Sequence, residues 1–199
     1  MNFTRSIAPA LAVSVIAICA GCRSTPNIKF AYDAGAPPAP TQACHVSLRL
    51  SREFSEYQHV TKAVFMVHSG AAVSFGPALQ KYAAYVAQSQ FGEVEMLGSN
   101  PPSSDSKLLI VPSVTSSDLA PATDALSPTA AALGVQWVFQ DPKTGQTLLT
   151  IPVQCEYMDP SGFWRSPSKA AVGLMMKLTA ATNDRLSASK DLRRLTGHE

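Results

Sequence analysis

Residues 129–157 read TAAALGVQWVFQDPKTGQTLLTIPVQCEY, and this stretch decides the fold. Apolar residues such as Val135, Trp137 and Phe139 recur at every second position in both halves, which is the period of a β-strand with one buried face. The central DPKTG, residues 141–145, has the composition of a turn. The stretch therefore predicts a β-hairpin with a five-residue connection. Pro152 has no N–H to donate to a ladder, so we expect the second arm at a sheet edge or at a bulge.

Further elements are predicted on both sides of the hairpin. Alternating or β-rich runs predict strands over residues 44–51, 61–67, 93–97 and 107–114. Three- and four-residue apolar spacing predicts two helices, one entered at Ser74 and Pro77 and ending near Phe91, the other entered at Ser166-Pro167. Beyond Leu186 the apolar spacing thins, and we expect the chain end to fray. This order predicts an α+β fold, a mainly antiparallel sheet of about five to six strands with two helices packed on one face.

The first 22 residues resemble the signal of a bacterial lipoprotein. Arg5 lies in a short polar start, residues 7–20 are almost wholly apolar, and the run closes on Ala20-Gly21-Cys22. An apolar core of about 14 residues is too short to cross a bilayer, which needs about 20. The resemblance implies a signal peptide over residues 1–21 and acylation of Cys22 with palmitate or similar chains. The alternative is ordinary cleavage near Ala20.

Arg23 follows the predicted lipid anchor. In enterobacterial lipoproteins an aspartate at this place resembles a signal to stay in the inner membrane, so arginine points to the periplasmic side of the outer membrane. Prolines 26, 37, 38 and 40 then interleave with small and polar residues. They predict an extended Pro-rich tether over residues 22–43, with a reach of up to about 60 Å, and a single periplasmic domain over residues 44–199.

Charge and cysteine usage narrow the class of protein further. Removing residues 1–21 deletes Arg5, so the formal charge of +2 becomes +1, which does not favour nucleic-acid or acidic-substrate binding. With Cys19 discarded and Cys22 acylated, Cys44 and Cys155 remain. In an oxidising periplasm they are a natural disulfide pair. The alternative is two free cysteines packed as small hydrophobes.

A family resemblance is carried by three short stretches: FGPAL at residues 75–79, LIVP at residues 109–112 and DPKTG at residues 141–145. The pattern looks like small outer-membrane lipoproteins whose domain resembles the N-terminal domain of the translocation protein TolB. That group includes curli-secretion components, activators of penicillin-binding proteins and, more loosely, the lipopolysaccharide-assembly lipoprotein. Several uncharacterised lipoprotein families share the pattern. The resemblance covers residues 64–186, carries no catalytic positions and implies assembly or partner binding.

The motifs of common enzymes are missing from the sequence. His45, His59, His68 and His198 have no Cys, Asp or Glu partner at zinc-ligand spacing, and there is no G-x-S-x-G elbow or glycine-rich phosphate loop. The dipeptide His68-Ser69 has no orienting acid nearby. We therefore expect no metal, no cofactor and no enzymatic activity.

Two features are candidates for contact with a partner. Phe163, Trp164 and Arg165 combine aromatic bulk with a guanidinium, the residue types enriched at binding hot spots, although the two aromatics fit a core cap equally well. The chain after Pro160 is also biased towards cations, a pattern that suits anionic head groups or the ordinary wet face of a helix. The seven cations are Arg165, Lys169, Lys177, Arg185, Lys190, Arg193 and Arg194.

These observations favour a lipid-anchored, non-enzymatic accessory or assembly factor that docks on an envelope protein complex, with Cys22 as the anchor and Trp164 and Arg165 as contacts. The alternative is a lipid or glycolipid carrier that holds an apolar ligand between the sheet and Leu174, Met175 and Leu178.

Overall fold

A computed structural model describes residues 27–60, 72–120, 130–159 and 167–197. Its main layer is a five-stranded sheet in the order β5-β2-β6-β7-β8. These strands are β2 (His45–Arg49), β5 (Glu93–Leu97), β6 (Leu108–Ala120), β7 (Ala130–Gln140) and β8 (Thr147–Met158). The hairpin predicted from residues 129–157 is β7 and β8, and β8 is the edge strand expected from Pro152. The α+β class is confirmed.

The sheet is mixed in direction. The pairings β6 with β7 and β7 with β8 are long and antiparallel, whereas β2 pairs in parallel with both of its neighbours, β5 and β6. Strand β2 is short, and its pairing with β6 ends at Ile110, close to the start of β6. Beyond that level β6 pairs only with β7, and Pro112 lies where the missing N–H is tolerated.

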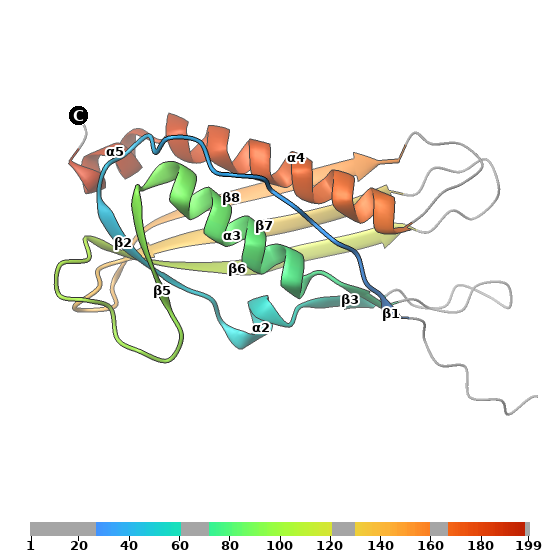
Figure 1. The fold of residues 1–199 in the computed structure, drawn as a ribbon, viewed down its shortest axis with the longest axis horizontal. Helices are drawn as coiled ribbons and strands as arrows, with labels where there is room; N and C mark the ends of the chain where they lie inside the picture. Colours follow the sequence, from blue (N-terminus) through green and yellow to red (C-terminus); the bar gives the residue numbers. More distant parts are fainter. Residues whose placement is uncertain (1–26, 61–71, 121–129, 160–166, 198–199) are drawn as a thin grey trace, which may run out of the picture.

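Two long helices cover one face of the sheet, as predicted (Figure 1). They are α3 (Gly76–Gln90) and α4 (Pro167–Ala188), and each points its buried residues at the sheet and at the other helix. The core includes Leu48, Trp137 and Phe139, all fully buried. A buried hydrogen-bond chain joins the layers: Trp137 Nε1 donates to Tyr82 Oη at 2.9 Å, and Tyr82 Oη lies 2.8 Å from Thr182 Oγ1.

The chain end does not fray as expected. After α4 the backbone forms a second helix, α5 (Lys190–Thr196), whose N-cap is Ser189. The Ser189 side chain accepts a hydrogen bond from Leu192 N at 3.2 Å, and Gly197 ends the helix in a left-handed conformation. The prediction of fraying was based on the absence of a long run of apolar spacing. Helix α5 is instead short and is stabilised by the caps at its two ends.

A second, three-stranded sheet lies beside the first, in the order β1-β4-β3. Its strands are β1 (Asn27–Ile28), β3 (Gln58–Val60) and β4 (Ala72–Ser74), and the one-turn helix α2 (Arg52–Ser55) precedes β3. Each strand spans two or three residues, so none has an alternation long enough to be recognised. The strand predicted at residues 61–67 lies outside the described residues.

Residues 27–43, which we call the N-terminal arm, differ from the free tether that was expected. The arm begins as β1, paired with β4, and then crosses α3 and α4 towards α5 (Figure 1). The Phe30 ring packs edge-on against Phe75 at 5.3 Å, and the buried Tyr32 hydrogen-bonds Thr179 of α4. Proline favours an extended chain, and an extended chain lies as easily on a helical surface as in solvent once aromatic side chains attach it. Residues 27–43 therefore pack against the helices of the domain.

No helix among the described residues is both long and apolar enough to cross a membrane.

Candidate functional site

The predicted anchor and contact residues, Cys22, Trp164 and Arg165, lie outside the described residues. The predicted disulfide can be assessed, and it is wrong: Cys44 and Cys155 are both free and buried. Burial raises the pKa of both thiols, opposed by Lys107 near Cys44 and by Lys177 near Cys155. The alternative of two cysteines that pack as small hydrophobes describes them correctly.

Sheet order explains why these cysteines do not pair. Cys44 immediately precedes β2, whereas Cys155 is in β8, and β6 and β7 lie between the two strands. Three strand spacings amount to about 14 Å, whereas a disulfide requires Cα atoms within about 7 Å of each other. Spacing along the chain carries no information about the order of strands in a sheet.

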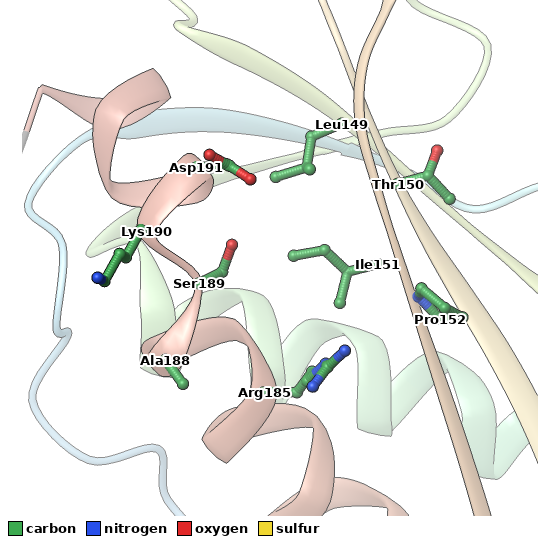
Figure 2. Close-up of a pocket in the computed structure, with 9 residues that line it drawn as sticks. All are labelled: Leu149, Thr150, Ile151, Pro152, Arg185, Ala188, Ser189, Lys190 and Asp191. Carbon is green, nitrogen blue, oxygen red and sulfur yellow. The ribbon is translucent and has the colours of Figure 1, made fainter.

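The structure places a cleft of about 280 Å³ where the first half of β8 meets the junction between α4 and α5 (Figure 2). Its floor is apolar, formed by the half-buried Leu149 and the buried Ile151. The residues that line it are Leu149, Thr150, Ile151, Pro152, Arg185, Ala188, Ser189, Lys190 and Asp191. We call this site the β8–α5 cleft.

The local sequence accounts for the cleft. Ser189 leaves the helical conformation, with φ −73° and ψ 110°, so the backbone changes direction between α4 and α5. The helical layer that covers β8 along α4 is interrupted at this point, and the first half of β8 remains accessible (Figure 2). The cleft is therefore the end of the helix-on-sheet interface.

The rim of the β8–α5 cleft carries more positive than negative charge. Arg185 comes from the last turn of α4 and Lys190 from the first residue of α5, and both side chains are exposed. Within the part of the chain that the structure describes, neither makes an ion pair. The third charged residue, Asp191, lies 3.7 Å from Arg194. In Figure 2 the Lys190 side chain points away from the apolar floor, whereas the Asp191 carboxylate points toward Leu149, so the cleft presents charges of both signs.

Two other cations of the C-terminal region, Lys177 and Arg193, bond to backbone carbonyls. Lys177 Nζ donates to the carbonyl of Glu156 at 2.8 Å, and the Arg193 guanidinium donates to the carbonyl of Ser187 at 3.1 Å. These contacts hold helix α4 to β8 and α5 to α4. Of the seven cations noted in the sequence, it is Arg185 and Lys190 that share a concave site.

A serine–histidine contact that sequence reasoning missed joins the two sheets. Ser117 Oγ of β6 lies 2.7 Å from His59 Nδ1 of β3 and hydrogen-bonds the Tyr57 hydroxyl. Burial lowers the pKa of His59, against the opposing effect of Asp118, which favours the neutral imidazole. The three groups satisfy one another, and they fasten β3 to β6. The partners are 58 residues apart, and no local motif signals them.

A second polar group surrounds the start of β2. His45 Nδ1 lies 3.2 Å from Asp105 Oδ2, and Ser47 donates to Glu95 at 3.0 Å. The Ser47 bond, together with hydrogen bonds from Ser103, lowers the pKa of the half-buried Glu95 carboxyl. These contacts tie β2 to β5 and to the loop before β6. Among the described residues no cluster of three or more His, Cys, Asp or Glu is placed to hold a metal ion.

The space required by a lipid carrier is filled with side chains. Leu174, Met175 and Leu178 are fully buried and belong to one continuous hydrophobic core with residues of β7 and β8. An apolar ligand between α4 and the sheet would have to displace that core. The methionine at this helical spacing is core packing.

No protein-family model and no curated protein sequence matches the chain. Solved structures share its fold. A DUF330-family protein from Xanthomonas campestris superposes with a TM-score of 0.54 at 12% identity, covering 83% of this chain and 97% of that one. The PelC dodecamer of Paraburkholderia phytofirmans superposes with a lower TM-score of 0.40 at 14% identity, covering 75% of this chain and 94% of that one. A minor lipoprotein of Acinetobacter baumannii superposes with a TM-score of 0.39 at 12% identity, covering 78% of this chain and 96% of that one. The fold is thus that of the Xanthomonas protein, and it is not specific to the TolB domain.

Proposed function

We propose that the protein is a lipid-anchored accessory factor of the bacterial envelope, held on the periplasmic side of the outer membrane, that acts by binding a protein partner and catalyses no reaction. The observation that carries this proposal is the apolar run that ends on Ala20-Gly21-Cys22. Arg23 supports the choice of the outer membrane. Acyl chains on Cys22 would provide stable attachment if more than one is present.

The position of β1 supports one orientation of the molecule on the membrane. Asn27 starts β1, five residues after Cys22, so a fully extended chain lets Cys22 lie within about 17 Å of the folded unit. β1 lies at the end of the molecule where β6 and β8 finish and α4 begins, and α5 lies at the opposite end (Figure 1). The β1 end is therefore the one we expect to face the membrane.

Trp164 and Arg165 are proposed contacts with the partner. They lie between Met158, the last residue of β8, and Pro167, the first residue of α4, and both of these belong to the β1 end (Figure 1). A partner embedded in or resting on the same membrane would meet this end first. Confinement near the membrane raises the effective concentration of the two proteins, so weak contacts suffice.

Substituting the proposed anchor tests the first part of the proposal. We expect Cys22→Ser to abolish incorporation of labelled palmitate and to move the protein from the membrane fraction to the soluble fraction, because no thiol remains to carry the acyl chains. Cys19→Ser, three residues earlier in the predicted leader, is the matched control and should leave both readouts unchanged. A wild-type protein that takes up no label would contradict the proposal.

Cross-linking in intact cells tests the proposed contact. We expect Trp164→Ala to reduce the yield of a cross-linked envelope protein several-fold, since aromatic residues dominate binding hot spots. Met176→Ala removes another large apolar side chain, 61% exposed on α4, and should leave the yield unchanged. Equal yields from wild type and Trp164→Ala, or capture of no envelope protein by the wild type, would count against this contact.

A further inference from the structure

We propose that the pocket between the N-terminal arm, α3 and α4 receives a basic side chain, lysine or arginine, of a protein partner, whose cation is balanced by Asp33 and Asp184. The inference rests on the proposed function in that it supplies a way for the partner to be recognised. We call this site the arm pocket. It is a different surface from Trp164 and Arg165 and from the β8–α5 cleft.

Three elements build the arm pocket. The arm contributes Tyr32 and Asp33, α3 contributes Tyr85, and α4 contributes residues spaced three and four apart from Met176 to Asp184. That spacing places the α4 residues on one stripe of the helix, which the arm crosses (Figure 1). The pocket has a volume of about 390 Å³, which lies within the range of small-ligand sites and leaves room for one long side chain.

The apolar part of the lining comes from two aromatic side chains and a methionine. Tyr32 is buried, and its hydroxyl is bonded to Thr179 of α4. Tyr85 is half-buried, and Met176 is 61% exposed, an unusual exposure for a large apolar side chain. The carbon stem of a lysine or arginine can cover such a surface, and a cation is attracted to the face of an aromatic ring.

The charged residues that line the arm pocket are Asp33 and Asp184, and none of the described residues that line it is a cation. Within the described part of the chain neither carboxylate makes an ion pair. The residues three and four positions from Asp184 along α4 carry no charge, so the helix itself offers no partner. They are Ala180, Ala181, Ser187 and Ala188. Two carboxylates beside aromatic side chains therefore complement a cation in charge.

The Tyr32 hydroxyl lies within this negative environment. Burial raises the pKa of Tyr32, the bond to Thr179 opposes that effect, and the neighbouring Tyr85 and Asp33 raise the pKa further. An electrostatic effect of this kind requires Asp33 to lie near the hydroxyl, so its negative charge acts on the pocket.

Position in the molecule favours a protein side chain over a lipid head group. Thr179 comes twelve residues after Pro167, the first residue of α4, which corresponds to about 18 Å along the helix axis. Pro167 belongs to the β1 end, which we expect to face the membrane (Figure 1). A lipid ammonium group at the bilayer surface would stay at least that far from the pocket, whereas a partner protein can approach the helical layer from the side.

An NMR titration of the full chain in neutral detergent micelles tests the proposal. The probes are N-acetyl-lysine methylamide and N-acetyl-arginine methylamide, and N-acetyl-norleucine methylamide is the neutral comparison. We expect at least one basic probe to shift the backbone amide signals of Thr179, Ala180 and Asn183 with a Kd of about 1–10 mM, because one side chain supplies only part of a partner's contacts. The norleucine probe should bind at least about tenfold more weakly, and added salt should weaken the basic probe.

Variants of the two carboxylates and of the aromatic wall give matched controls. Asp33→Asn with Asp184→Asn removes both charges, and asparagine keeps the side-chain acceptor of the turn that follows residue 33. This double variant should lose about tenfold in affinity for the basic probe. Glu53→Gln with Glu93→Gln changes the net charge equally at two exposed residues outside the pocket and should lose nothing. Tyr85→Leu keeps an apolar side chain without the aromatic ring and should lose about threefold.

A further probe, dihexanoyl phosphatidylethanolamine, separates a side-chain site from a head-group site. No response to either basic probe would overturn the proposal, and binding of this soluble lipid through the same two aspartates would then identify a head-group site. Equal affinity for the basic and neutral probes, or no effect of the double aspartate variant, would also overturn it. None of these readouts depends on Cys22 acylation, so failure of the anchor and failure of the arm pocket are distinguishable.

Discussion

At the scale of single residues, a chain of buried hydrogen bonds crosses the middle of the core, and each hydroxyl in it accepts one bond and donates the next. Thr182 Oγ1 donates to the carbonyl of Leu178 at 2.7 Å, so Tyr82 must donate to Thr182, and Trp137 donates to Tyr82. One residue of β7, one of α3 and one of α4 are thereby fixed relative to each other. Burial raises the pKa of Tyr82 far above its ordinary value, so its hydroxyl keeps the proton that the chain requires.

Tyr82→Phe should destabilise the fold by about 1–3 kcal/mol. The change leaves the Trp137 indole N–H buried without an acceptor, and an unsatisfied buried donor costs the desolvation free energy of that group. Urea or thermal unfolding followed by circular dichroism measures the loss. Tyr85→Phe removes a hydroxyl from a half-buried tyrosine one turn along the same helix and should change stability by less than about 0.5 kcal/mol. Equal stabilities of the two variants would show that the chain contributes nothing.

Thr179, one turn earlier in α4, makes the same kind of hydrogen bonds. Its hydroxyl donates to the carbonyl of Met175 at 2.7 Å and accepts a hydrogen bond from the hydroxyl of Tyr32 in the N-terminal arm. The sequence spacing predicted the helices α3 and α4, which carry Tyr82 and Thr182. It did not identify either hydrogen bond, because partners 100 or 147 residues apart leave no local pattern.

At the scale of elements, the N-terminal arm is the main addition to the predicted architecture. Besides β1, it bonds to the end of α3, where Gln42 N donates to the carbonyl of Gln90 at 2.8 Å, and to α5, where Thr196 Oγ1 donates to Gln42 Oε1 at 2.6 Å. The arm therefore contacts both long helices and α5. Its contacts tie α3, α4 and α5 to one another across the helical layer.

Tyr32→Ala should release the arm while the sheet stays folded. Removing a buried aromatic side chain costs about 3 kcal/mol, and most of that loss should be local because Tyr32 contacts α4 from outside the sheet. Hydrogen–deuterium exchange followed by mass spectrometry should show faster exchange in residues 27–34 and unchanged protection in β6 to β8. Lys29→Ala alters an exposed side chain of the same arm and is the control. Uniformly faster exchange in the whole chain would indicate global destabilisation instead.

The longer elements were predictable because each carries a sustained period. The hairpin β7–β8, the helices α3 and α4 and strand β5 were predicted from alternation or from three- and four-residue spacing. β1, β3 and β4 are too short to show any period, and they exist because other strands pair with them. The parallel pairing of β2 was not predicted because the pattern of a single strand does not reveal the direction of its neighbours.

At the scale of the whole molecule, the β8–α5 cleft depends on how the elements are arranged in space more than on which residues the sequence contains. Arg185 and Lys190 were recognised in the sequence only as two of seven cations, and Leu149 and Ile151 only as one face of a hairpin arm. The turn at Ser189 brings these four residues to a common cleft. The mistaken Cys44–Cys155 disulfide has the same origin, because strand order is a property of the complete fold.

The close packing of residues 27–43 also changes how an acylated form of the protein would search for its partner. With β1 starting five positions after Cys22 and α4 about 33 Å long, no part of the folded unit would extend much beyond about 50 Å from the bilayer. Such a molecule drifts laterally with its lipid and explores a thin layer in two dimensions. Any protein it recruits must enter that layer, so a target fixed deeper in the periplasm would stay out of range unless the arm first detached.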